Sequence, residues 1–185
     1  EEWPGVYMSV SSDILPQVRE YERFSTTVVN SYVGPGTADY LRNLESELEV
    51  QGFGGEFLVI LSNGGVIDGQ YASDRPASML LSGPAGGVLA ATEVIAKKTD
   101  LKNLITIDMG GTSCDVCVVP NAQPQVTSTT YVERHAVSLP MLAIHTIGAG
   151  GGSLARVDAG GVLRVGPQSA GATPGPACYG RGGEL

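Results

Sequence analysis

The chain carries few charges, and basic residues are the scarcer kind. Of 185 residues, 11 are lysine or arginine and 19 are aspartate or glutamate, which leaves a formal net charge of −8. Nucleic acids and anionic membranes are bound through clustered basic residues, so both are poor candidates for partners. An anionic ligand would have to be held by backbone amides and a metal ion.

Long apolar runs are also missing. No segment approaches the ~20 apolar residues that a membrane-spanning helix needs. Residues 1–4, Glu-Glu-Trp-Pro, do not have the pattern of a signal peptide. We therefore expect a cytoplasmic protein that does not associate with membranes.

Cysteine is scarce and odd in number, which favours reduced thiols. Cys114 and Cys117 form a C-x-x-C pattern, and Cys178 stands apart. The pattern leaves open a redox pair or half of a zinc site. On a strand, however, residues three apart point to opposite faces, so we expect the two sulfur atoms to diverge.

Glycine and hydrophobic residues dominate what is present. The 26 glycines and 11 prolines stay below the level of a low-complexity chain, which is roughly 25–30%. Hydrophobic residues make up 42% and charged residues 16%, which describes a compact domain with few solvated faces. At this length we expect a single domain over residues 1–185, with a surface that suits a partner.

The most informative stretch is residues 103–120, NLITIDMGGTSCDVCVVP. Two β-prone runs flank a glycine tip, which predicts a hairpin in which Gly110 and Gly111 permit positive φ. Bare amides and the Thr112 hydroxyl suit a phosphate, and Asp108 at the strand end suits a hydrated Mg²⁺. An ordinary tight hairpin is the alternative.

The preceding part of the chain predicts helices and one buried strand. Ser25, Thr26 and Thr27 form a candidate N-cap cluster, and we expect the helix after them to be interrupted at residues 34–36 and resumed over 37–50. The apolar run at 57–61 predicts a parallel strand covered on both faces. The SNGG turn that follows is either a ligand loop or a simple turn.

The remaining chain predicts strands joined by glycine turns. Residues 125–137 and 141–147 are strand-like and hold His135 and His145, which could meet as part of a metal site or serve structural or substrate-side roles. A glycine loop follows at 148–153, and a hairpin turn is expected at 158–161.

Six stretches, in this order, resemble the hydantoinase A and 5-oxoprolinase family, which includes subunits of acetone and acetophenone carboxylases. They are EYERFSTTVVNSYVGP at 20–35, LSNGGV at 61–66, RPASMLLSGPAGGV at 75–88, DMGGTSCDV at 108–116, IGAGGGSLA at 147–155 and VGPQSAGATPGPACYGRGG at 165–183. The resemblance implies an α/β fold, an RNase-H-like lobe of the actin, sugar-kinase and chaperone ATPase type with helices packed on a mixed sheet. It also implies that the chain is the central, second-lobe segment of a longer protein.

The resemblance further implies ATP and Mg²⁺ as cofactors. Asp108 would be the metal ligand, and Asp115 would orient the hairpin or an attacking water. The residues that would face phosphate are Gly110, Gly111 and Thr112 on the hairpin, and Gly150, Gly151, Gly152 and Ser153 in the glycine loop.

The activity implied is ATP-dependent hydrolysis of a cyclic amide such as hydantoin or 5-oxoproline, with a hydantoinase B-type partner. ATP-dependent ketone carboxylation and a nucleotide switch of the same fold are alternatives, because fold alone does not separate them. The superfamily builds its ATP site between two lobes, and this chain has one D-x-G hairpin, so we expect the chain by itself to be inactive.

Overall fold

The computed structural model describes residues 5–184, which divide into two compact units. The first consists of residues 5–89 and 125–143, and the second of residues 90–124 and 144–184. No helix in this part of the chain is both long and apolar enough to cross a bilayer. A single domain over 1–185 stays a prediction, and residues 1–4, where we expected no signal peptide, lie outside the described residues.

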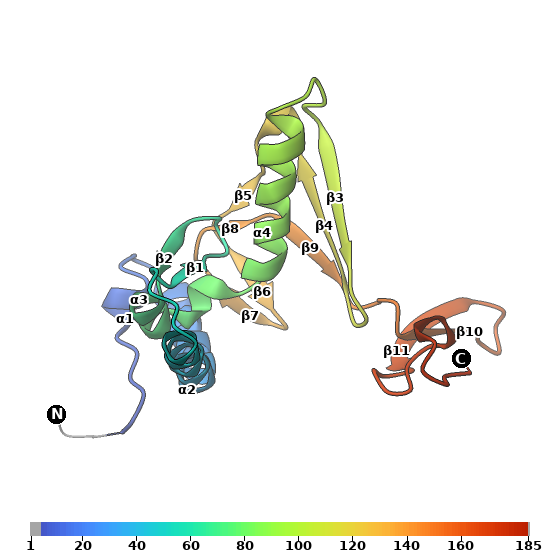
Figure 1. Cartoon of the computed structure of the whole chain (residues 1–185), viewed down its shortest axis with the longest axis horizontal. Helices are drawn as coiled ribbons and strands as arrows, with labels where there is room; N and C mark the ends of the chain where they lie inside the picture. The colour runs from blue at the N-terminus through green and yellow to red at the C-terminus, as the bar shows by residue number, and fades with distance from the viewer. Residues whose placement is uncertain (1–4, 185) are drawn as a thin grey trace. The chain divides into compact units, whose positions relative to one another are not determined.

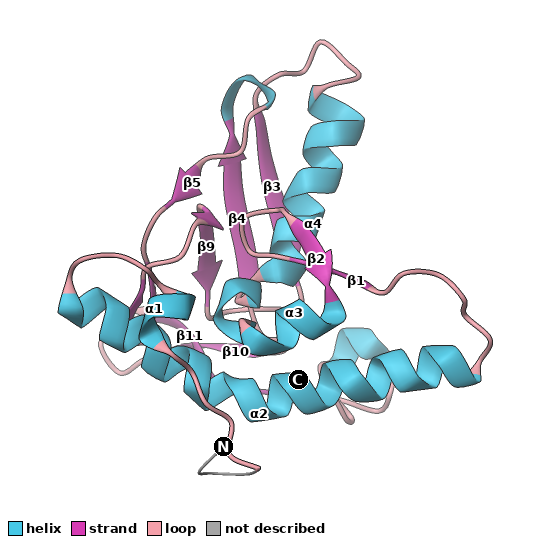
Figure 2. Cartoon of the chain, turned by 90° about the vertical axis from the view of Figure 1, so that its left-hand side faces the viewer, coloured by secondary structure: helices cyan, strands magenta, loops and turns pink. Residues whose placement is uncertain are grey.

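Helices dominate the first unit. They are α1 (Ser11–Ile14), α2 (Glu20–Val50), α3 (Gly69–Asp74), the 3-10 turn η1 (Pro76–Met79) and α4 (Ser82–Ala91), which leads into the second unit. The strands form two-stranded antiparallel sheets: β1 (Leu58–Ile60) with β2 (Val66–Asp68), β5 (Val126–Thr127) with β8 (Met141–Leu142), and β6 (Thr130–Val132) with β7 (His135–Val137). Figure 2 shows α2 lengthwise, with α3 beside it.

The helix α2 is continuous over 31 residues, so the predicted N-cap at Ser25 and the predicted break at residues 34–36 are wrong. Pro35 lies inside it, although an internal proline costs a helix about 3 kcal/mol. Tertiary contacts offset this cost. The Tyr7 ring packs so closely on Gly34 that a Cβ there would lie 2.1 Å from a ring carbon, and the Tyr7 hydroxyl donates to the Ser73 carbonyl at 2.8 Å.

Buried polar side chains of α2 fasten it to the rest of this unit. Asn30 is fully buried; its amide nitrogen donates to Ser9 Oγ at 2.9 Å, and its oxygen accepts from the Ala77 amide at 3.1 Å. The Thr26 hydroxyl accepts from the Ser138 amide at 2.9 Å. A buried polar group without a partner is costly, so these bonds specify where α2 packs.

The predicted parallel strand at 57–61 is wrong. It forms β1, which pairs antiparallel with β2 across the Ser62–Gly65 turn. That turn is closed by its own hydrogen bonds, from the Leu61 amide to the Gly65 carbonyl at 2.8 Å and from the Gly65 amide to Asn63 Oδ1 at 2.8 Å. The hydrogen bonds of the turn impose antiparallel pairing on the apolar run, and this geometry favours the simple-turn interpretation.

The second unit is mostly β-structure. It contains the π-helical turn η2 (Thr92–Ala96), the three-stranded sheet β3 (Leu104–Met109), β4 (Cys114–Val119) and β9 (Ile144–Ile147), the pair β10 (Ser153–Val157) and β11 (Leu163–Ser169), and the short turns η3 (Pro120–Ala122) and η4 (Ala177–Tyr179). Figure 1 shows β3, β4 and β9 side by side. The predicted hairpins at residues 103–120 and around 158–161 are both present. The predicted strand over 125–137 instead forms three short strands, and 141–147 forms two.

Candidate functional site

The hairpin tip at residues 110–113 joins β3 to β4 and has an unstrained backbone. The Gly110 amide donates to the Ser113 carbonyl at 3.0 Å. Neither Gly110 nor Gly111 has positive φ, so the predicted reason for these glycines is wrong. A Cβ on Gly110 would meet nothing within 4 Å, and one on Gly111 would meet only the Tyr179 hydroxyl at 3.2 Å, so the close backbone approach at this tip requires glycine in the second, opposing segment.

That second segment is the glycine loop between β9 and β10. The Gly151 amide donates to the Gly110 carbonyl at 2.9 Å, and the Gly152 amide donates to the Gly111 carbonyl at 2.9 Å. A Cβ on Gly150 would lie 2.6 Å from the Gly110 carbonyl oxygen and 2.8 Å from the Thr112 amide nitrogen. Only glycine fits at position 150, so the structure brings together the two glycine segments that the sequence singled out.

The amides of this loop are engaged within the chain. The Gly150 amide donates to Ser153 Oγ at 2.9 Å, and the Ser153 amide donates to the Gly150 carbonyl at 2.9 Å. Since Gly151 and Gly152 donate to the hairpin, the loop braces the tip. Within residues 5–184, the amides of Gly111 and Thr112 donate no hydrogen bond, and both residues are exposed. The donors left for a ligand are therefore on the hairpin.

Two carboxylates stand beside the tip. Asp108 on β3 is directly opposite Asp115 on β4, which in turn is opposite Thr146 on β9. Directly opposed residues face the same side of a sheet with Cβ atoms about 5 Å apart. The Thr146 hydroxyl donates to Asp115 Oδ1 at 2.5 Å. None of the ion pairs among the described residues involves Asp108 or Asp115, so the like charges have no cationic side chain to offset them.

This arrangement fits Mg²⁺ with a phosphate. Magnesium binds through one or two carboxylates and keeps waters and phosphate oxygens as its other ligands, so it needs no third protein ligand. Asp108 and Asp115 would supply the carboxylates, and the amides of Gly111 and Thr112 would supply donors for phosphate. No group of three or more His, Cys, Asp or Glu side chains among residues 5–184 could hold a metal, which argues against a closed zinc-type site there.

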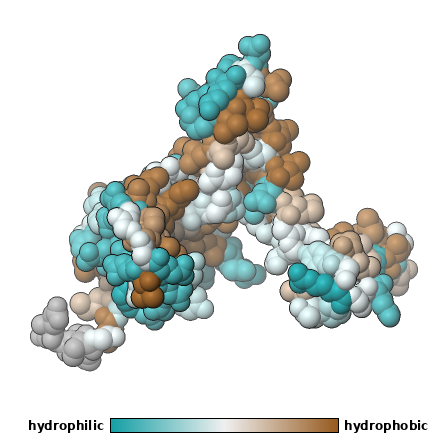
Figure 3. Space-filling model, viewed as in Figure 1, coloured by the Kyte–Doolittle hydropathy of each residue, from teal (hydrophilic) through white to brown (hydrophobic). Residues whose placement is uncertain are grey.

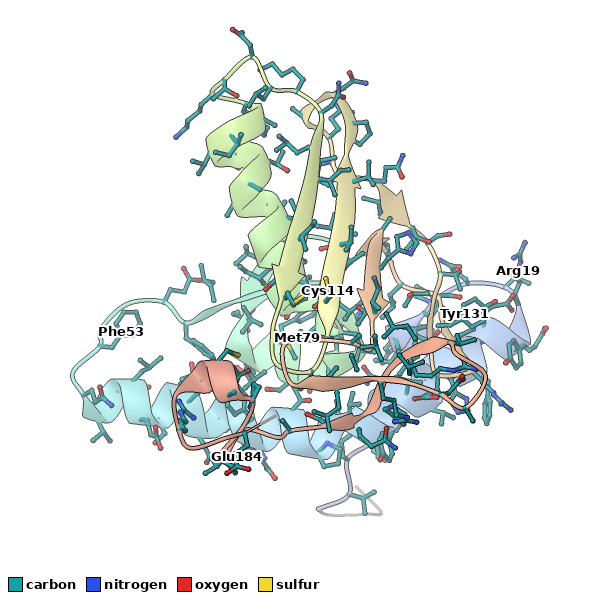
Figure 4. All side chains as sticks on the ribbon, turned by 90° about the vertical axis from the view of Figure 1, so that its right-hand side faces the viewer. Arg19, Phe53, Met79, Cys114, Tyr131 and Glu184 are labelled. Carbon is teal, nitrogen blue, oxygen red and sulfur yellow. The ribbon has the colours of Figure 1, made fainter. Side chains whose placement is uncertain are left out.

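The cysteines of the C-x-x-C pattern diverge as predicted. Cys114 is opposite Met109 and Cys117 is opposite Thr106, so they lie on opposite faces of the hairpin. Figure 4 labels Cys114 at the tip end of β4. Both are buried, and burial raises the pKa of the Cys117 thiol above its ordinary value. A raised pKa keeps the thiol protonated and unreactive near neutral pH.

The two histidines belong to different units. His135 is opposite Val132 in the β6–β7 pair of the first unit, and His145 is opposite Val116 in the β4–β9 pair of the second. The hypothesis of a shared metal site gains no support from these positions.

Two residues at this site, Thr146 and Tyr179, were not expected from the sequence. Thr146 holds Asp115, and Tyr179 places its hydroxyl 3.2 Å from where a Cβ of Gly111 would stand. Each had a signal. Thr146 is a hydroxyl residue in the strand that leads into the glycine loop, and Tyr179 is the one aromatic residue in the glycine- and proline-rich segment 165–183.

The fold and the site define a class: an α/β protein with a candidate phosphate site built from a braced glycine hairpin and paired carboxylates. The chain belongs to the hydantoinase/oxoprolinase family, because the profile of that family, described as Hydantoinase/oxoprolinase, matches residues 23–185.

Three similar proteins illustrate the family. Caprolactamase subunit alpha of Pseudomonas jessenii is 39% identical over 180 residues, which cover 97% of this chain and 26% of that subunit. 5-Oxoprolinase 1 of Arabidopsis thaliana is 38% identical over 179 residues, which cover 97% of this chain and 14% of that protein. The nucleotide-free structure of acetone carboxylase matches with a TM-score of 0.78 and 30% identity, over 94% of this chain and 24% of that chain.

These matches confirm the predicted family and the predicted α/β fold class. The ATP-dependent caprolactamase also has a solved structure, which matches this chain with a TM-score of 0.74. The family thus includes ATP-dependent hydrolases of cyclic amides and ATP-dependent carboxylases. The chain spans about a quarter or less of the length of these relatives.

Proposed function

We propose that this chain supplies one phosphate- and Mg²⁺-binding half of the ATP site in an ATP-dependent cyclic amide hydrolase. The observation that carries the proposal is the glycine hairpin, braced by a second glycine loop and flanked by Asp108 and Asp115. The hydrolase assignment is supported by the 38–39% identity to a 5-oxoprolinase and a caprolactamase, whose names specify cyclic amides.

Each residue has a task in this proposal. Asp108 and Asp115 hold the metal. The amides of Gly111 and Thr112 donate hydrogen bonds to phosphate oxygens, and the Thr112 hydroxyl is a further donor. Thr146 keeps one oxygen of Asp115 occupied, which fixes how that carboxylate faces the metal or a water. The glycine loop keeps the tip in place through its backbone hydrogen bonds; it consists of Gly150, Gly151, Gly152 and Ser153.

ATP supplies a phosphoryl group that can turn a poorly departing amide oxygen into a good leaving group. The protein's contribution to such a transfer is positioning and neutralisation of charge. A rigid tip with fixed amides performs the first task. The carboxylate pair performs the second by recruiting a cation.

A ketone carboxylase is the second candidate. The structure of acetone carboxylase matches this chain with a TM-score of 0.78, against 0.74 for the caprolactamase. Both activities require an oxygen atom to be activated by phosphorylation, so the same half-site serves either. Sequence identity, 39% against 30%, favours the amide hydrolase.

A partner subunit of the hydantoinase B type and a cytoplasmic location complete the proposal. One face of β3 presents Ile105, Ile107 and Met109, which are 67%, 68% and 62% exposed. Figure 3 shows hydrophobic surface, in brown, where β3 lies in Figure 1. Exposed apolar faces mark surfaces that another polypeptide covers, and the caprolactamase relative is named as a subunit. The free thiols of Cys114, Cys117 and Cys178 are typical of a reducing compartment.

ATP turnover by the full-length protein tests the proposed activity. We expect hydantoin, 5-oxoproline or caprolactam to stimulate ADP release, since a phosphoryl acceptor completes the reaction. Acetone with bicarbonate serves as the matched carboxylase assay. Stimulation only by the ketone would favour the second candidate, and turnover unaffected by any of these compounds would favour a nucleotide switch.

We expect the isolated 185 residues to show no ATP hydrolysis above background. Asp108, Gly111 and Thr112 are exposed, so water competes for every contact to phosphate and the gains of a closed site are absent. The measurement is ADP release, together with the melting midpoint in the presence and absence of millimolar ATP and Mg²⁺. Hydrolysis or a large shift of the midpoint would mean that the site is complete within this chain.

A further inference from the structure

Tyr179 lies against the hairpin tip, although it belongs to the last segment of the described chain. Its hydroxyl oxygen stands 3.2 Å from the position that a Cβ of Gly111 would occupy, and 3.9 Å from that of Gly151. It therefore borders both glycine segments at once. This hydroxyl makes no hydrogen bond within residues 5–184, and Tyr179 is 41% exposed, so the hydroxyl is open to a ligand beside the tip.

The ring of Tyr179 is held in place by its own segment. Gly175 has φ +78° and packs under the ring, since a Cβ there would lie 2.6 Å from Tyr179 Cδ2. The Tyr179 amide donates to the Pro176 carbonyl at 2.9 Å. The hydroxyl is thus aimed at the tip by a packed ring.

A positive charge accompanies this ring. The Arg181 guanidinium carbon lies 6.0 Å from the Tyr179 ring centroid, and Arg181 Nη1 donates to the Ala172 carbonyl at 3.4 Å. A free hydroxyl donor, free amides at Gly111 and Thr112, and a nearby cation all favour a negatively charged oxygen. These groups come from segments that are far apart in the sequence.

From this geometry we infer that Tyr179 is a phosphate-binding residue: its hydroxyl donates a hydrogen bond to the phosphate oxygen held by the hairpin amides. The inference rests on the proposed function, because that phosphate belongs to the ATP proposed above. It adds a side-chain donor from the segment around residues 175–181 to a site otherwise built from backbone and carboxylates.

The test is Tyr179→Phe in the full-length protein, which removes one oxygen atom and leaves the ring on Gly175. We expect the KM for ATP to rise about tenfold, as for loss of a hydrogen bond to a charged group, with the melting midpoint unchanged. The inhibition constant for adenosine, which has no phosphate, should stay the same. Tyr131→Phe, on the exposed β6 of the first unit, is the matched control and should change neither value.

The outcomes separate this inference from the proposed function. An unchanged KM for ATP in Tyr179→Phe, in a protein whose turnover is abolished by Asp108→Asn, overturns the inference alone. An equal loss of affinity for ATP and adenosine, or a lowered melting midpoint, assigns Tyr179 a structural role and also overturns it. Full turnover in Asp108→Asn overturns the proposed function and this inference together.

Discussion

Asp108→Asn is expected to lower Mg²⁺-dependent ATP turnover of the full-length protein at least about a hundredfold. Asparagine keeps the shape of the side chain and removes the charge that would hold the metal, and neutralisation of phosphate charge by a metal is worth several kcal/mol of transition-state stabilisation. The measurement is the rate of ADP release at saturating Mg²⁺.

The stability of Asp108→Asn, in contrast to its turnover, should stay the same or rise slightly. Asp108 is directly opposite Asp115, and like charges in that position destabilise a sheet by roughly 0.2–1 kcal/mol. Without nucleotide, Asp108→Asn should therefore melt at the same temperature as the parent or slightly higher. A purely structural aspartate would instead lose stability on substitution.

Asp100→Asn is the matched control, because Asp100 is an exposed carboxylate in the loop before β3. It should retain the parent's turnover. Asp108→Asn protein that is folded and turns over ATP at the parent's rate would refute the assignment of Asp108 as the metal ligand.

Gly150→Ala is expected to separate the glycine loop from the hairpin tip. The new Cβ would meet the Gly110 carbonyl oxygen at 2.6 Å and the Gly111 carbonyl carbon at 2.8 Å, both of them backbone atoms that cannot rotate away. The loop must shift, which weakens the bonds from Gly151 and Gly152. Overpacking and two weakened hydrogen bonds together cost about 2–4 kcal/mol.

Gly148→Ala in the same loop is the control. Nothing lies within 4 Å of a Cβ at that position, and its φ is not positive, so the added methyl group is tolerated. Thermal melting should show a clear drop for Gly150→Ala alone, and ATP turnover should fall with it because the tip loses its brace. Equal melting midpoints in the two variants would show that the loop does not brace the hairpin.

Much of the candidate site follows from local sequence. The D-x-G-G-T stretch between two β-prone runs predicted a hairpin, and β3 and β4 form it. A four-residue tip at 110–113 pairs Met109 with Cys114, and so also pairs Asp108 with Asp115. The same period of two predicted that the two nearby cysteines diverge.

The family also follows from the sequence, because it depends on which residues occupy short stretches and in what order. The resemblance covered nearly the whole chain, and the family profile matches residues 23–185. The substrate within the family is a different kind of property. The stretches that identify the family do not specify the substrate, and the chain spans about a quarter or less of its relatives' length.

Helix α2 shows where local interpretation fails. Gly34 and Pro35 predicted a break, because both residues disfavour helix and a sequence window holds no information on what packs against them. The helix is continuous because Tyr7 packs on Gly34 and the buried side chain of Asn30 makes hydrogen bonds to other elements. The free energy of these tertiary contacts exceeds a helix-propensity cost of a few kcal/mol.

The sequence by itself determined the turns, the hairpins, the alternation of faces and the family, since these depend on dihedral preferences and spacing over a few residues. Only the tertiary structure decided that the loop at Gly150 docks on the tip at Gly110, that Thr146 holds Asp115, and that the Tyr179 hydroxyl borders Gly111. Each of these joins residues distant in the chain. Such pairs form because close approach, hydrogen bonding and burial are satisfied together, and no local pattern specifies that combination.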